Sequence, residues 1–229
     1  MKNLVAFLIL AFIAFNSTAQ EKSTPDFQKV NFGLRFNPLI SFLKVDSDTL
    51  EGTGPKLGFS YGAMLEFNLA ENYAVAFELM LSQVPGSFKY TTSGIDSSVE
   101  MNVQYVEIPV MLKGKTNEIG YFTYFGHFGL DIGMRTVAKG DVLVKNVLKY
   151  EDIVLNGEEI ISDGERTGVM APDVRFFRLG LVIGAGAQYS LGGSTYLLGG
   201  LSFNNGFTNV VKEHPIKSAY VALNLGVLF

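Results

Sequence analysis

Apolar and polar residues alternate along most of this chain with a period of two, the spacing of a β-strand whose two faces meet different surroundings. The last ten residues show it most clearly, with bulky apolar side chains at the odd positions Val221, Leu223, Leu225, Val227 and Phe229. Small or polar residues occupy the even positions Ala222, Asn224 and Gly226. This repeat is typical of a transmembrane β-barrel strand, with one face toward lipid and the other toward the lumen.

Seven more segments follow the same pattern, so the chain contains eight predicted strands. They span 29–43, 57–68, 73–89, 99–113, 120–137, 174–189, 195–205 and 218–229. Most of them exceed the roughly 9–11 tilted residues that cross a bilayer. Short connections at 69–72, 114–119 and 190–194 alternate with longer ones, of which 138–173 is the longest. The sequence therefore predicts an all-β fold, an eight-stranded antiparallel up-and-down transmembrane β-barrel with short periplasmic turns and long outer loops.

Charged side chains share the face of the small and polar residues. They are Arg35, Glu66, Glu78, Glu107, Lys113, Asp131, Arg135 and Arg178. A lipid-facing Arg or Lys near the bilayer midplane costs about 2–4 kcal/mol, so we expect all of them in the lumen. An unpaired buried charge is also costly, which predicts a hydrogen-bonded ion network that fills the lumen. A soluble, lipocalin-like barrel has the reverse pattern, with an apolar interior.

The two ends of the chain favour export. Lys2, an apolar run over 4–15 and the small residues Ser17 and Ala19 predict a signal peptide at 1–19, which leaves 20–229 as the barrel domain. An even strand number places both termini on one side, so we expect both to be periplasmic in the outer membrane of a Gram-negative bacterium. We interpret the final strand as the signal that the barrel-assembly machinery recognises, through Leu223, Leu225, Val227 and Phe229.

Composition excludes several classes of function. The chain has 18 Lys and Arg against 22 Asp and Glu, which argues against a nucleic-acid partner. It has no Cys, so it has no disulfide, thiol nucleophile or thiolate metal site. The acidic residues of 138–173 lack EF-hand spacing, and no helix follows Gly184-Ala185-Gly186 as a nucleotide-binding turn requires. We therefore predict no cofactor and no metal. The inward Gly184 and Gly186 are expected to make room for large side chains, near Arg178.

A barrel enzyme is the least favoured interpretation. His127 is the one histidine in the predicted strands, and Asp131 on the same face lies about 14 Å away along the strand. Catalysis would need a nucleophile such as Ser82 or Ser202 from another strand. We expect a structural histidine and a protein that is not an enzyme; loss of a lipid-directed activity in His127→Ala would contradict this.

The segment 104–113, Gln-Tyr-Val-Glu-Ile-Pro-Val-Met-Leu-Lys, resembles the Tyr-(Leu/Val)-Glu-Ile-Pro stretch of PorT-like outer-membrane β-barrel proteins, which are common in the Bacteroidetes. The segments 120–122, 190–194 and 224–229 look like the same porin-family proteins, in the same order. The resemblance implies an outer-membrane barrel and, for one branch of the family, a part in protein secretion and gliding. Pro109 removes a ladder hydrogen bond, which predicts an interruption beside Glu107.

Three functions stay open from the sequence. The first is a structural or partner-binding barrel, embedded in outer-membrane lipid, whose outer loops bind a protein. The second is a narrow channel for small solutes, although an eight-stranded interior holds only side chains or one small ligand. The third is a secretion-associated component of the PorT type. Residues 142–144 and 160–161 are either loop or extensions of the flanking strands as a hairpin above the membrane.

Overall fold

The computed structural model describes residues 28–45, 50–92, 95–145, 160–162, 165–170, 174–211 and 215–229. The predicted signal peptide at 1–19 lies outside these residues. Within them, no helix is long and apolar enough to cross a membrane.

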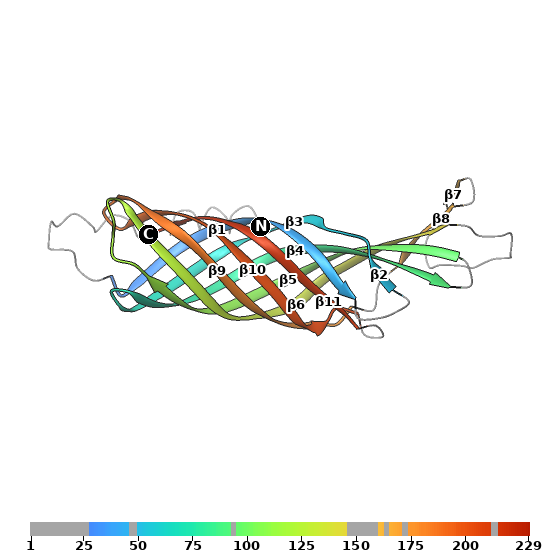
Figure 1. Ribbon diagram of the computed structural model, residues 1–229, viewed down its shortest axis with the longest axis horizontal. Coiled ribbons are helices and arrows are strands. Elements are labelled where there is room, and N and C mark those ends of the chain that lie inside the picture. The colour runs from blue at the N-terminus through green and yellow to red at the C-terminus, as the bar shows by residue number, and fades with distance from the viewer. Residues whose placement is uncertain are drawn as a thin grey trace, which may run out of the picture.

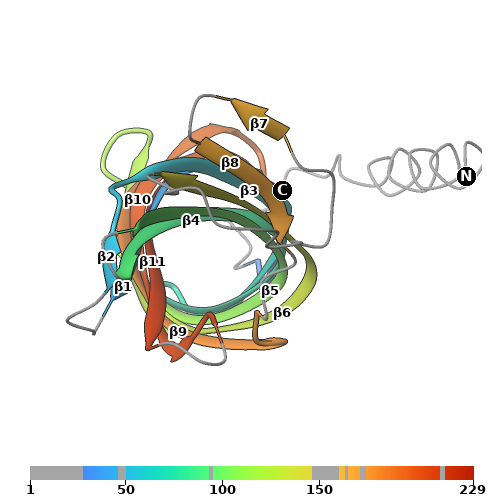
Figure 2. The same cartoon turned by 90° about the vertical axis from the view of Figure 1, so that its right-hand side faces the viewer.

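Eight long strands make up the body of the described structure. They are β1 (Val30–Val45), β3 (Lys56–Ala70), β4 (Tyr73–Thr92), β5 (Ile95–Lys115), β6 (Phe122–Lys145), β9 (Phe177–Gly192), β10 (Thr195–Asn209) and β11 (Ile216–Leu228). Each strand pairs antiparallel with the next of these along the chain, and β11 pairs with β1, so the sheet closes into a ring (Figure 1, Figure 2). The predicted eight-stranded antiparallel barrel is confirmed.

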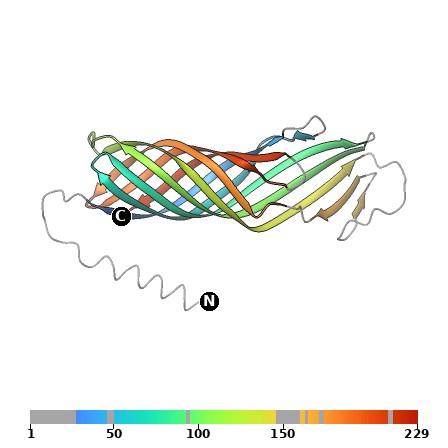
Figure 3. The same cartoon turned by 90° about the horizontal axis from the view of Figure 1, so that it is seen from below.

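The two ends of the barrel differ. The turns 71–72, 116–121 and 193–194 lie together at one end, where β1 also begins and β11 ends; we call it the short-turn end. At the opposite, extended end β4, β5 and β6 run on beyond the ring of strands (Figure 3). The predicted alternation of short and long connections holds only in part. The connections after β1 and β6 are long, but β4 runs to Thr92 and β5 begins at Ile95, and the connection 210–215 is no longer than 116–121.

Short strands add to the sheet at the extended end. β2 (Leu50–Gly52) pairs with the end of β4, and β8 (Glu165–Met170) pairs with both β6 and β7 (Ile160–Ser162). The prediction that 138–173 is a loop is wrong at its beginning, because β6 continues to Lys145 and stays paired with β5 as far as Asp96. The apolar residues 142–144 extend the strand, as the hairpin alternative expected, whereas 160–161 pair with β8 instead of continuing β9.

The outside of the ring is apolar, and the buried charged side chains of the strands lie inside it. Leu223 and Leu225 on β11 are 44% and 43% exposed, while Asn224 between them is 1% exposed. Val227 and Phe229, the remaining residues of the assembly-signal strand, are half-buried. The predicted inversion of faces relative to a soluble barrel is thus confirmed.

Proline interrupts the ladder at two seams. Between β4 and β5 the ladder has a gap between the pairs Phe77–Val110 and Met80–Glu107, although the register is the same on both sides. Pro109 lies in this gap and has no partner on β4. This is the interruption expected beside Glu107, since proline carries no backbone N–H. The ladder between β1 and β11 has a gap of the same length at Pro38, again without a change of register.

Candidate functional site

Arg178 on β9 lies at the centre of a buried ion cluster in the lumen. Its Nη1 donates to Glu107 Oε1 at 3.0 Å and to Asp131 Oδ2 at 2.7 Å. Gly133 on β6 pairs with Arg178 on one side and with Glu107 on the other. A Cβ on Gly133 would stand 3.3 Å from Arg178 Cβ and 3.5 Å from Glu107 Cγ. The ion pair therefore crosses β6 where that strand has no side chain.

Neutral donors complete the cluster around the two carboxylates. Arg178 Nη2 donates to Asn204 Oδ1 at 2.6 Å, and Asn204 Nδ2 donates to Asp131 Oδ2 at 2.6 Å. Glu107 Oε2 accepts from Ser82 Oγ at 2.5 Å and from Tyr220 Oη at 3.1 Å. These bonds offset part of the cost of removing the charges from water.

A second ion pair joins Arg35 on β1 to Glu78 on β4, with β3 lying between the two strands. Both side chains are buried. Arg35 Nε has no hydrogen-bond partner among the described residues. This pair lines two small cavities, one of which also contacts Glu107 and the other Glu66 and Lys113.

Two lysines share one carboxylate nearer the short-turn end. Glu66 on β3 accepts from Lys113 Nζ at 2.6 Å and from Lys115 Nζ at 2.7 Å. The intervening strand β4 presents Ala74 and Ala76 at these positions, in register with Lys113 and Glu66 respectively. Small side chains there let the residues of β3 and β5 meet across it. Lys113 Nζ also lies 4.3 Å from the ring centroid of Phe125.

Arg135 lies apart from these pairs. It is half-buried and forms no ion pair with another described residue. The β5–β6 register shifts there, from Tyr105–Arg135 to Gln104–Val137, so Thr136 is an extra residue in β6. A bulge of this kind reverses which positions face the lumen. The period-two rule that places Arg135 with the other charges therefore stops applying at this residue.

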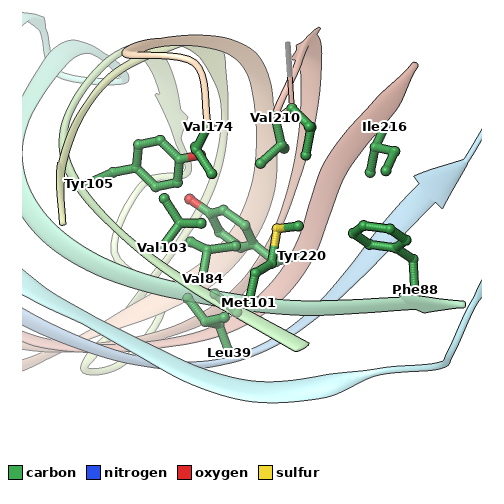
Figure 4. Packing of buried hydrophobic residues seen from close by; sticks show 12 residues of the cluster. Leu39, Val84, Phe88, Met101, Val103, Tyr105, Val174, Val210, Ile216 and Tyr220 are labelled. Atoms are coloured by element: carbon green, nitrogen blue, oxygen red, sulfur yellow. The ribbon is translucent and has the colours of Figure 1, made fainter. Parts of the chain in front are cut away.

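An apolar layer, not expected from the sequence, fills the lumen at the extended end. Its members include Leu39, Val84, Phe88, Met101, Val103, Val174, Val210 and Ile216. Figure 4 shows their side chains pointing toward one another from β1, β4, β5 and β11, together with Val174 and Val210, which lie just before β9 and just after β10. The rings of Tyr105 and Tyr220 belong to the same layer, and the Tyr220 hydroxyl reaches Glu107. The apolar layer thus packs directly onto the Arg178 cluster.

Sequence patterning carried a signal for this layer. Phe88 and Val84 have the same parity as the inward Glu78 and Ser82, and Met101 and Val103 the same parity as Glu107. Because the charged residues lie at inward positions, the sequence pattern predicted a lumen that is polar along its whole length. The structure corrects this prediction: the ion pairs lie in the middle of the lumen and toward the short-turn end, an apolar layer fills the extended end, and a smaller apolar cluster of Met64, Phe125, Leu198 and Leu228 lies among the polar groups near the short-turn end.

His127 lies between two small cavities rather than in a catalytic arrangement. One cavity, of about 30 Å³, is also lined by Arg35 and Asn224, and the other, of about 10 Å³, by Arg35 and Lys113. These volumes hold roughly two water molecules and one. Unpartnered polar atoms face this region within the described chain: Arg35 Nε, Asn37 Oδ1, His127 Nε2 and Asn224 Nδ2.

The candidate nucleophiles are engaged elsewhere. Ser82 Oγ donates to Glu107, and Ser202 Oγ donates to Asn224 Oδ1 at 3.1 Å. The imidazole of His127 stacks on Phe125, with ring centroids 5.8 Å apart. No cluster of His, Asp and Glu among the described residues has the arrangement of a metal site.

Glycines make room for this aromatic pair. A Cβ on Gly184 would lie 2.7 Å from His127 Nε2, and one on Gly186 would lie 2.7 Å from Phe125 Cζ. The prediction that these glycines accommodate large side chains is confirmed, but the side chains are His127 and Phe125, not the neighbours of Arg178.

The sequence matches a family model, and the fold is similar to those of several solved structures. A family model described as outer membrane protein beta-barrel domain matches residues 18–212. Among solved structures, the chain is similar to Neisserial surface protein A (12% identity, 86% of this chain and 95% of that one, TM-score 0.44). It is also similar to OprG from Pseudomonas aeruginosa (11%, 86% and 94%, 0.45) and to Ail, the attachment invasion locus protein of Yersinia pestis (13%, 88% and 99%, 0.39). No curated protein matches the chain.

Proposed function

We propose a function on the premise that this chain belongs to the outer membrane protein beta-barrel domain family. It is an outer-membrane β-barrel protein. Its proposed role is that of a closed, non-enzymatic barrel. The strands at its extended end form a platform, defined below, that binds a protein partner outside the cell. In this proposal the short-turn end and both termini are periplasmic, and the extended end faces the medium.

The observation that carries the proposal is the filling of the lumen. Going from the extended end inward, the path meets the apolar layer, then the Arg178 cluster, then the pair of Arg35 and Glu78, then the pair of Glu66 and Lys113. The two cavities between them hold only a few water molecules. Such packing supports a barrel that does not conduct solutes.

The platform consists of β2, β7, β8 and the parts of β4, β5 and β6 that extend beyond the ring (Figure 3). Loops and strands held on a rigid barrel are well suited to binding because their position is set by the scaffold. A structural barrel alone would not need strands of 21 and 24 residues such as β5 and β6, roughly twice the length that spans a bilayer.

The proposal is tested by purifying native complexes from the outer membrane. The wild type is compared with a variant in which 146–173 is replaced by a short Gly-Ser linker, which keeps β6 and β9 intact. We expect one defined partner to copurify with the wild type and to be lost from the variant. Equal recovery with both, or no partner with either, contradicts the proposal. Secretion components among the copurified proteins would support the PorT-type role.

A narrow channel is the second candidate. It is favoured by the two cavities, which share Arg35 and His127 and lie one after the other along the lumen. Planar-bilayer recordings distinguish the two candidates. The closed barrel predicts no unitary current, whereas a channel predicts a current that changes in Glu107→Gln or Arg135→Ala.

A further inference from the structure

A groove of about 330 Å³ lies on the outer surface of the barrel at the short-turn end, over β4, β5 and β6. Its lining residues are Asn72, Tyr73, Gly114, Lys115, Thr116, Tyr124, Phe125 and Gly126. It is separate from the lumen and from the platform at the opposite end. Of its lining residues, Lys115 and Phe125 also contact residues of the lumen.

Two glycines leave the floor of the groove empty. Gly114 and Gly126 are direct partners in the β5–β6 ladder, and Tyr73 on β4 is the partner of Gly114 on the other side. A Cβ on Gly114 would meet nothing within 4 Å, and one on Gly126 would meet only Gly184 O, at 3.9 Å. Packing inside the barrel therefore does not require glycine at either position. Their effect is to open space on the outer face.

Two tyrosines form the walls. Tyr73 is 65% exposed and lies beside Gly114 on β4, and Tyr124 is 51% exposed and lies two residues from Gly126 along β6, toward the turns. Tyr124 belongs to a group of contacting aromatic rings at this end that also contains Tyr121, Phe122 and Tyr189, and Tyr73 is exposed at the same end of the barrel. Tyrosines gather where a membrane meets water, because the ring prefers the apolar side and the hydroxyl the polar side.

The groove changes character along its length. Toward the turns it ends at the polar residues Asn72 and Thr116. Toward the middle of the barrel its surroundings are the exposed apolar side chains of Leu112 and Phe128, the next outward positions on β5 and β6. The groove is therefore continuous with the lipid-facing surface on one side and with the interfacial region on the other.

We propose that this groove binds one glycerophospholipid of the adjacent leaflet. The first methylenes of an acyl chain lie on Gly114 and Gly126, in contact with the two tyrosine rings. The hydroxyls of Tyr73 and Tyr124 donate to the ester or phosphate oxygens of the same molecule. The occupant is a lipid because the groove opens onto the surface that the outer membrane covers. The inference depends on the membrane location, and it does not depend on a partner at the platform.

Native mass spectrometry tests this proposal, with the full-length protein in detergent titrated with palmitoyl-oleoyl phosphatidylethanolamine. We expect the wild type to retain one lipid. The double variant Gly114→Leu/Gly126→Leu fills the groove and should raise the apparent Kd at least about tenfold, the equivalent of about 1.4 kcal/mol. Heat-dependent gel mobility shows whether each variant is folded.

Gly199 provides the matched control. It is exposed on the outer face of β10, and a Cβ there would also meet nothing within 4 Å. Gly199→Leu should therefore bind lipid as the wild type does. Tyr73→Phe/Tyr124→Phe keeps the walls and removes both hydroxyls, so it should bind more weakly than the wild type and more tightly than the filled variant.

Two results would overturn the inference. One is equal lipid retention by the wild type, the filled variant and the Gly199→Leu control. The other is a wild-type dimer that the filled variant abolishes, which would make a second copy of the chain the occupant. Neither result bears on the copurification of a partner, so failure here is distinguishable from failure of the proposed function.

Discussion

Replacing Arg178 by methionine removes the cation from the central ion cluster while keeping much of the side-chain volume. Glu107 and Asp131 then stay buried, at 2% and 0% exposure, without a charged partner. Breaking a buried pair by removing one ion costs about 3–5 kcal/mol. Here two carboxylates lose their cation, but Ser82 and Asn204 still donate to them. We therefore expect a loss of about 4 kcal/mol in the free energy of unfolding.

The assay is urea unfolding in lipid vesicles, followed by far-UV circular dichroism and by the mobility of the folded band on gels. The chain contains no tryptophan, so tryptophan fluorescence cannot serve as the probe. The triple variant Arg178→Met/Glu107→Gln/Asp131→Asn removes all three charges together. It should recover most of the lost stability, because amides can still hydrogen-bond in the cluster and no unpaired charge remains.

An exposed ion pair supplies the control. Lys56 and Glu100 lie 2.6 Å apart, with side chains 34% and 61% exposed. Lys56→Met should change the free energy of unfolding by less than about 1 kcal/mol. If Arg178→Met cost no more than this control, or if the triple variant were as unstable as the single one, the interpretation of the lumen as a charge-balanced network would be refuted.

Three further predictions concern other layers of the barrel and use the same unfolding assay. Gly184→Ala should destabilise the protein by about 1–3 kcal/mol, because the new methyl overlaps the backbone oxygen of Leu201 and the His127 ring, whereas Gly199→Ala, at an open position, should change little. Phe88→Ala should cost about 3–5 kcal/mol by emptying part of the apolar layer, and a change below about 1 kcal/mol would show that this layer is loosely packed. Leu223→Arg should cost about 2–4 kcal/mol in vesicles, because it puts a cation against lipid; an unchanged midpoint would contradict the assigned outer face.

Strand positions and faces could be predicted because both depend on local pattern. Side chains alternate across any extended strand, so the parity of Leu223 and Asn224 fixes their opposite environments before the partner strands are known. The same rule predicted the burial of Arg35, Glu66 and Glu78. It failed at Arg135, because Thr136 is an extra residue in β6, and the sequence does not mark that bulge.

Which charged residues form ion pairs in the lumen could not be predicted. Arg178 meets Glu107 over Gly133, and Glu66 meets Lys113 across β4, so each pair depends on the register of a strand between the partners. Register in a barrel is set jointly by strand number and stagger, which are properties of the closed ring. The apolar layer was missed for a related reason. Its members come from segments that are far apart in the sequence and that meet only when the ring is closed.

The sequence by itself determined that this protein is a barrel with lipid-facing and lumen-facing sides, since a period of two is written into each strand separately. Only the tertiary structure decided which charges pair, where the lumen changes from polar to apolar, and that Gly114 and Gly126 lie side by side, with Tyr73 next to them on β4. The physical reason is that alternation is a property of neighbouring residues, whereas contact across strands depends on how the whole sheet is staggered and closed.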